Sequence, residues 1–196
     1  MKDIFNFIFT FRNPEKVLDK TDNQKRKFIF TFMFIFVVCY LFFIVGSFIL
    51  SIKALYGKFI DTSSIVFIDG IIMMVFASFI ATLIISVALG LSKLVVFKIF
   101  RLDKNFLDSI YLGIIPFTVI IFKFFIDFIF VLIALYTTSK ITNYLEYLNY
   151  MIFIWYLLLD FLLMKKLTNN TKTAIISVII SMLILIAFII LLPASK

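Results

Sequence analysis

The chain has 196 residues, of which 64% are hydrophobic and only 15% charged, with 28 Phe and a formal net charge of +8. An average globular chain is about half apolar and about a quarter charged. A soluble domain of this length could not bury so many aromatic and branched side chains, because its surface is too large for its volume. The composition therefore excludes a soluble fold and predicts an all-α bundle of membrane-spanning helices.

The supply of chemically reactive side chains is small. The sequence has no His and a single Cys, Cys39, which stands in an apolar run and fits a packing residue. This excludes a disulfide framework, a Cys/His zinc site and a Cys/His nucleophile pair, so we predict no catalytic residue, metal or cofactor. The basic residues lie between hydrophobic runs instead of on a soluble face. Anionic lipid headgroups are therefore the expected partner, and nucleic acid is not.

Residues 1–27 form an expected cytoplasmic segment. We expect Asn13 to cap a short helix that begins at Pro14. The basic cluster at 25–27 either sets the topology or binds acidic lipid. Before Asn13, apolar residues at helical spacing predict an interfacial helix among the headgroups, with a disordered tail as the alternative. These apolar residues are Ile4, Phe5, Ile8 and Phe11.

Five runs are long and apolar enough to cross a bilayer, which takes about 20 residues. They predict a transmembrane bundle over 28–196, or four spans if the fourth run only dips into the membrane. No short apolar core with a cleavage site precedes them, so the first span is expected to stay as an anchor. The five runs are 28–52, 70–92, 109–139, 147–164 and 173–195.

The Lys and Arg residues between the spans predict the orientation. Alternate segments, starting with the N-terminal one, carry 14 of these residues and the remaining segments carry 4. Positively charged loops stay in the cytoplasm, which places the N-terminus inside and the C-terminus outside a cell (plasma) membrane. The segment 93–104 is then expected at the cytoplasmic membrane surface.

Small residues follow one face of the second span at four-residue spacing. Such residues let helices approach closely, either inside the bundle or across a dimer. A shorter set in the last span comprises Ala174, Ser177 and Ser181. The set in the second span comprises Ser78, Thr82, Ser86 and Gly90.

The third span contains a proline and two charges. Pro116 lacks an N–H and clashes with the carbonyl of Leu112, so we expect a helix bend there. Lys123 and Asp127 stand one turn apart on the same face, as a structural pair or as a functional one. Asp160 in the fourth span is less informative, because it lies close to the lysines at the cytoplasmic end.

Several short stretches of the chain form a recognisable set: Asn13-Pro14-Glu15, the run from Asn105 to Tyr111 with Ile115-Pro116-Phe117, Ile154-Trp155-Tyr156 and Lys172-Thr173-Ala174. Together they resemble the bacterial branch of the Yip (Ypt/Rab-interacting) domain family. That resemblance implies five spans with a cytoplasmic N-terminus. Eukaryotic members bind prenylated small GTPases, and some bacterial members are associated with ABC exporters or envelope stress. The chain has no Asp-Leu-Tyr-Gly-Pro motif, so neither GTPase binding nor an active site carries over.

Three functional classes follow from these features. The first is a non-catalytic scaffold or accessory subunit that works with another membrane protein, which the lack of catalytic groups favours. The second is a small permease or channel using Lys123, Asp127 and the Pro116 bend, although no internal repeat of the kind common in transporters is present. The third is an intramembrane enzyme, for which acid-base and metal candidates are few.

Overall fold

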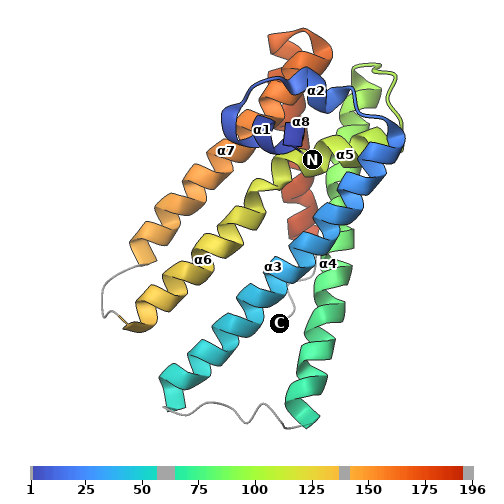
Figure 1. The fold of residues 1–196 in the computed structure, drawn as a ribbon. Coiled ribbons are helices and arrows are strands. Elements are labelled where there is room, and N and C mark those ends of the chain that lie inside the picture. Colours follow the sequence, from blue (N-terminus) through green and yellow to red (C-terminus); the bar gives the residue numbers. More distant parts are fainter. Residues whose placement is uncertain (1, 57–64, 137–141, 192–196) are drawn as a thin grey trace. The chain divides into compact units, whose positions relative to one another are not determined.

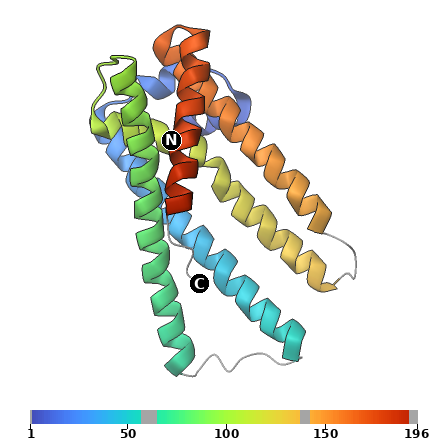
Figure 2. The same ribbon diagram turned by 180° about the vertical axis from the view of Figure 1, so that it is seen from behind.

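The computed structural model describes the backbone of residues 2–56, 65–136 and 142–191, and the side chains of 2–42, 72–73, 75–129, 147–184 and 186. Within these residues the chain forms helices and no strands, so the prediction of an all-α fold is confirmed (Figures 1 and 2). The helices are α1 (Lys2–Thr10), α2 (Pro14–Leu18), α3 (Asp22–Tyr56), α4 (Ile65–Ile99), α5 (Phe106–Phe117), α6 (Val119–Tyr136), α7 (Thr142–Thr168) and α8 (Thr171–Leu191).

The chain divides into two compact units. Unit 1 comprises Met1–Phe32, Ile84–Thr118 and Ile154–Lys196, and unit 2 comprises Met33–Leu83 and Val119–Phe153. Unit 1 therefore contains α1, α2, α5, α8, the N-terminal part of α3 and the C-terminal parts of α4 and α7. Unit 2 contains most of α3, α6 and the N-terminal parts of α4 and α7. Both units are thus assembled from segments far apart in the sequence.

Among the described residues, three helical stretches are long and apolar enough to cross a membrane: Val75–Ile99, Phe106–Ile129 and Tyr147–Thr168. They correspond to the second, third and fourth expected spans, and Thr171–Ile184 is a shorter apolar helix. The first expected span lies within α3. Five spans and the orientation stay predictions, because Lys58, Lys140, Lys196 and the residues 192–195 lie outside the described residues.

The boundary of the second span differs from expectation. We expected the span to end before Lys93, with 93–104 at the membrane surface, but α4 continues to Ile99. Val96, Phe97 and Lys93 itself are almost completely buried. Lys93 is therefore enclosed by neighbouring helices, although its charge ends an apolar run in the sequence, and its position relative to the membrane surface stays a prediction.

The third expected span consists of two helices. A capping box starts α5: Asn105 accepts a hydrogen bond from the Asp108 amide at 2.8 Å, and Asp108 accepts one from the Asn105 amide at 3.2 Å. The helix thus begins ahead of the expected residue 109. It ends one residue after Pro116, and α6 begins after Thr118. This interruption lies where the missing N–H of Pro116 was expected to disturb the helix.

The N-terminal segment forms two helices, and the buried face of α1 agrees with the expected apolar face at Ile4 and Ile8 only. Phe5 is 43% exposed and Phe11 is 39% exposed. Phe11 lies beyond the end of α1 with a φ of 56°, which takes it off the helical face. α2 begins at Pro14 as predicted, whereas Asn13 has a left-handed backbone and makes no side-chain cap. The residues that α1 buries are Ile4, Phe7 and Ile8.

Two glycines bring α4 and α5 into close contact in unit 1. A Cβ added at Gly90 would lie 2.5 Å from the Ile110 side chain. A Cβ added at Gly113 would lie 2.8 Å from the backbone oxygen of Leu89. Each helix therefore places a glycine against the other, which fits the packing role predicted for Gly90 and gives Gly113 one as well.

Candidate functional site: a buried ion pair between helices

The candidate site of unit 1 is an ion pair between α4 and α7. The ammonium of Lys93 donates hydrogen bonds to both carboxylate oxygens of Asp160, with Nζ 2.6 Å from Oδ2. It also donates to the hydroxyl of Ser181 on α8, at 3.1 Å. Three helices thus meet at one ammonium group, and all three donor positions of that group are used.

The site is closed to solvent. The side chain of Lys93 is 2% exposed and that of Asp160 is 1% exposed. Moving either charge alone out of water would be very unfavourable, so each charge depends on the other. The pair therefore ties α4 to α7, and the additional bond to Ser181 adds α8.

Lys93, Asp160 and Ser181 lie at similar distances from the ends of their helices. Lys93 lies about 9 Å before the end of the stretch Val75–Ile99, and Asp160 lies about 12 Å before Thr168, at about 1.5 Å per residue. Ser181 lies about 15 Å after the start of α8. The C-terminal ends of α4 and α7 and the N-terminal end of α8 therefore meet at the same end of unit 1 (Figure 2).

Sequence reasoning missed this pair. Lys93 was assigned to the membrane surface, and Asp160 was considered with Lys165. The ammonium of Lys165 instead lies 5.9 Å from the centre of the Phe161 ring. The signal was nevertheless present: a lone Lys and a lone Asp stand near the predicted cytoplasmic ends of two different spans. Opposite charges at matching depth on two helices are candidates for a pair.

Two side chains from the spanning helices fix the N-terminal segment to unit 1. The indole of Trp155 on α7 donates to the backbone oxygen of Ile8 at 2.9 Å. The hydroxyl of Tyr111 on α5 donates to the backbone oxygen of Val17 at 3.0 Å. Both acceptors lie in the last turn of a short helix, where carbonyl groups lack partners within the helix. Trp155 and Tyr111 thus cap α1 and α2.

Ion pairs add to this attachment. Lys20 donates to Asp3 at 2.5 Å, and this hydrogen bond, with the positive charge, lowers the pKa of the Asp3 carboxyl. Lys25 donates to Asp108 at 2.5 Å and to Asp22 at 3.2 Å. Partial burial acts to lower the pKa of Lys25, but these hydrogen bonds outweigh it and raise the pKa above its ordinary value. The segment is therefore held at both ends by charge.

Unit 2 contains the charge pair predicted within the third span. Lys123 donates to Asp127 one turn further along α6, with side chains 28% and 11% exposed. The other carboxylate oxygen of Asp127, Oδ1, is buried and has no hydrogen-bond partner within the described part of the chain. The pair therefore lies on one helix, and half of its acceptor group is unsatisfied.

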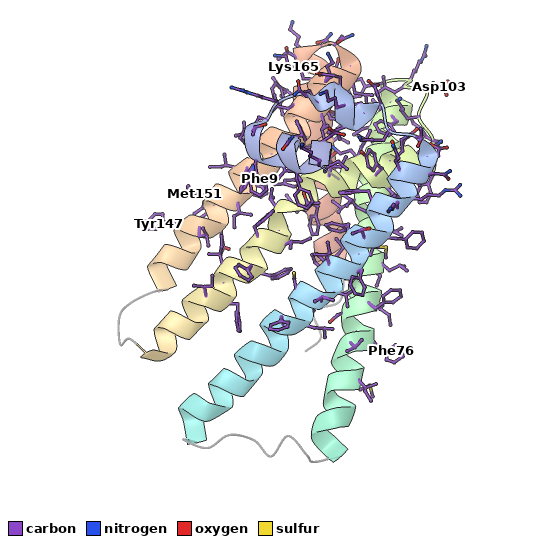
Figure 3. All side chains as sticks on the ribbon, viewed as in Figure 1. Phe9, Phe76, Asp103, Tyr147, Met151 and Lys165 are labelled. Carbon is purple, nitrogen blue, oxygen red and sulfur yellow. The ribbon has the colours of Figure 1, made fainter. Side chains whose placement is uncertain are left out.

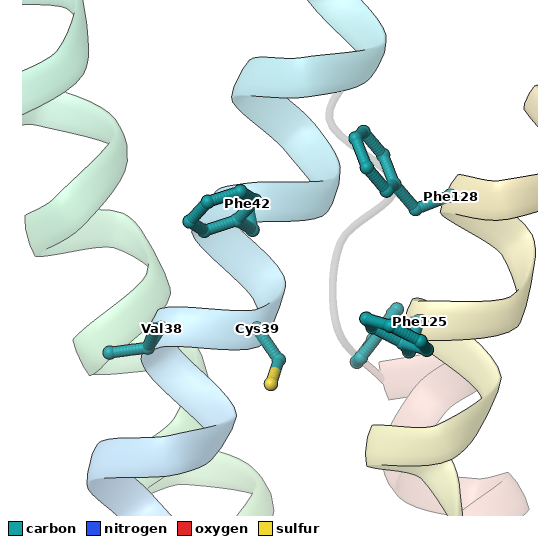
Figure 4. Close-up of a pocket in the computed structure, with 6 residues that line it drawn as sticks. Val38, Cys39, Phe42, Phe125 and Phe128 are labelled. Atoms are coloured by element: carbon teal, nitrogen blue, oxygen red, sulfur yellow. The ribbon is translucent and has the colours of Figure 1, made fainter. Parts of the chain in front are cut away.

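An apolar cavity of about 240 Å³ lies between α3 and α6 in unit 2 (Figure 4). Cys39 faces the rings of Phe125 and Phe128 across it. A cavity of this kind has no polar groups to hold water. The residues that line it are Val38, Cys39, Phe42, Phe124, Phe125 and Phe128.

The small residues predicted to form a packing face are buried. Ser78 and Thr82 are each 1% exposed and Ser86 is 4% exposed. The Thr82 hydroxyl donates to the backbone oxygen of Ser78 at 2.7 Å, so one polar group is satisfied within the helix. On α8, the corresponding set is also buried: Ala174, Ser177 and Ser181. Burial within a single chain favours internal packing over a dimer face.

The structure offers no alternative centre for metal chemistry among the residues it describes, where no three or more Cys, Asp or Glu side chains gather in a metal-binding group. The candidate site is therefore defined by Lys93, Asp160 and Ser181, with the capped N-terminal segment attached to the same unit. In comparisons with known proteins, no family model, curated protein or solved structure matches this chain.

Proposed function

We propose that this protein is a non-catalytic integral scaffold or accessory subunit of a bacterial plasma membrane, acting through another membrane protein. The resemblance to the Yip family suggests an exporter or an envelope-stress system as the setting. In this proposal the N-terminus is cytoplasmic, five spans cross the bilayer, and the basic loops contact anionic headgroups.

The observation that carries the proposal is the closure of the Lys93–Asp160 pair. A group that binds and releases a substrate needs a path to solvent, whereas these two side chains are 2% and 1% exposed. A pair that joins three helices without access to solvent holds those helices in fixed positions. A scaffold requires such fixed positions, because it presents constant surfaces to its partner.

The test replaces the pair by apolar residues of similar size. A Lys93→Met/Asp160→Leu double variant keeps the shape of the site and removes its charges. It should therefore still complement the defect caused by deleting the gene. It should also crosslink in membranes to the same partner as the parent chain. A double variant that folds normally but does not complement the deletion would contradict the scaffold proposal. A parent chain that crosslinks to no partner would contradict it as well.

A second candidate, a small permease or channel, rests on Asp127. Its buried Oδ1 atom has no hydrogen-bond partner among the residues that the structure describes, and intramembrane carboxylates occur on ion and proton paths. A Lys123→Met/Asp127→Leu double variant separates the two candidates. A permease would lose function although the double variant folds, because neither a lysine nor a carboxylate remains on α6 of this variant. A scaffold would keep its function.

A further inference from the structure

Helix α1 has two apolar faces, of which one is buried and the other is largely exposed. Ile4, Phe7 and Ile8 are at most 2% exposed. On the opposite side of the helix, Phe5 and Phe9 are 43% and 50% exposed. Positions 2, 5 and 9 follow the i, i+3, i+7 pattern, so Lys2 shares the face of the two phenylalanines. We call Lys2, Phe5 and Phe9 the outer face of α1.

The outer face cannot turn inward, because the inner face is fixed. Trp155 holds the backbone oxygen of Ile8, and its ring lies 5.8 Å from that of Phe9. Lys20 holds Asp3 on the flank of the helix. Any rotation that buried Phe5 would break both bonds and expose Ile4. The exposure of the outer face is thus set by the packing of α1 on unit 1.

The charges around the outer face are positive and accessible. Lys2 lies on the face itself, and Arg12 and Lys16 are exposed just beyond the end of α1. The one carboxylate of α1, Asp3, is already engaged by Lys20. Exposed phenylalanines are unfavourable in water, whereas exposed lysine and arginine are unfavourable in hydrocarbon. The interfacial layer of a negatively charged bilayer accommodates both.

We propose that the outer face of α1 docks on the surface of an anionic bilayer, with Phe5 and Phe9 among the upper acyl chains and Lys2 and Arg12 at the phosphates. This inference rests on the proposed membrane-integral function, and it names the lipid surface as the occupant of this face. α1 is then held between the bundle and the bilayer, so that a higher fraction of acidic lipid stabilises its docked position.

The experiment uses the full-length chain in nanodiscs. A nitroxide label is placed at Phe5→Cys in a Cys39→Ala background, and its collision rates with oxygen and with a water-soluble nickel chelate are measured. Asp103→Cys serves as the water control and Met151→Cys, which is 68% exposed on a spanning helix, serves as the lipid control (Figure 3). The label at position 5 should resemble the label at 151, at a depth of about 5–10 Å.

The second measurement varies the lipid charge. As phosphatidylglycerol rises from none to about two-fifths of the lipid, the oxygen-to-nickel collision ratio at position 5 should rise at least twofold, because the charge near the surface attracts Lys and Arg. A Lys2→Gln/Arg12→Gln variant should lose this dependence. A Lys98→Gln/Lys104→Gln variant removes the same charge elsewhere and should keep it. Fluorescence of Trp155, the single tryptophan, shows whether α1 remains packed on the rest of unit 1 in each variant.

Each result decides the proposal. A label at 5 that is as accessible to nickel as the label at 103 in every bilayer overturns it. So does a lipid dependence that survives the Lys2→Gln/Arg12→Gln change, or a label shielded from both oxygen and nickel. Failure of the membrane-integral premise would appear instead at position 151, and failure of the scaffold function would leave all these purified measurements unchanged.

Discussion

The two units of the chain use charge in opposite ways. In unit 1, Lys93 bonds to side chains on two other helices, 67 and 88 residues away. In unit 2, Lys123 bonds to Asp127 on its own helix, and one oxygen of that carboxylate is left over. Hydrogen bonds between helices fix their relative positions, whereas a pair within one helix fixes nothing outside it. The described hydrogen bonds therefore hold the helices of unit 1 in place more firmly than those of unit 2.

The apolar contacts repeat this difference. Unit 1 joins α4 and α5 through glycines that leave no free space. Unit 2 joins α3 and α6 through aromatic rings, such as Phe36 and Tyr40 against Phe124, beside a cavity of about 240 Å³. Close packing tolerates changes of shape poorly, and a cavity tolerates them well. We therefore expect unit 1 to resist substitution and unit 2 to accept it.

The largest expected difference concerns the ion pairs. Lys93→Met or Asp160→Leu alone should lower the free energy of unfolding by about 3–5 kcal/mol, because one buried charge is left uncompensated. The Lys93→Met/Asp160→Leu double variant should recover most of that loss. Detergent melting of all four proteins measures the cycle.

The matched cycle in unit 2 is the control. Lys123→Met alone should cost less than Lys93→Met, because Lys123 is 28% exposed and can reach a more polar environment. Equal losses in the two cycles would mean that the two units hold their charges equally tightly. A double variant no better than either single would show that the paired residues do not compensate each other.

The next largest effect distinguishes the two glycines. In Gly113→Ala the new methyl group meets the backbone oxygen of Leu89, which cannot move without shifting α4. In Gly90→Ala it meets mainly the Ile110 side chain, which can change conformation. We expect Gly113→Ala to cost about 1–3 kcal/mol and Gly90→Ala to cost less. Thermal melting in one detergent compares them, and the reverse order would contradict the close approach.

Local features were predictable from the sequence, and contacts between distant segments were not. The i, i+4 spacing of Lys123 and Asp127 and the position of Pro14 depend only on helical geometry, and both appear as expected. The Lys93–Asp160 contact depends on how two helices lie against each other, which no local pattern encodes. Phe7 was left out of the expected apolar face of α1 for the same reason, since it is buried by other parts of unit 1.

A smaller effect is expected from filling the cavity. Cys39→Leu adds apolar volume to a wall of the cavity, so the free energy of unfolding should stay within about 1 kcal/mol of the parent or rise. Ala174→Val is the matched change in unit 1, where the side chain is 0% exposed, and it should destabilise by about 1–3 kcal/mol through overpacking. Melting temperatures that fall equally for both variants would remove the contrast in packing.

The smallest effect is a pH dependence of the packing of α1 against the rest of unit 1. The pKa of Asp3 is lower in the folded chain than its ordinary value of about 3.8, mainly because Lys20 donates a hydrogen bond to it. The stabilisation is therefore fully present above about pH 3.8 and is lost as the pH falls through the folded pKa. Trp155 fluorescence should change over this acidic range in the parent. The change should be absent in Asp3→Asn, and its persistence there would assign it to another group.

The capping of α1 and α2 also has a consequence for the order of assembly during synthesis. Helices of nine and five residues are too short to be stable alone. Their caps, Tyr111 and Trp155, follow the residues that they bind by 94 and 147 positions. The segment that contains α1 and α2 therefore cannot form stable helices until the α7 region has been synthesised. Although it is made before α5 and α7, this segment completes its folding after them.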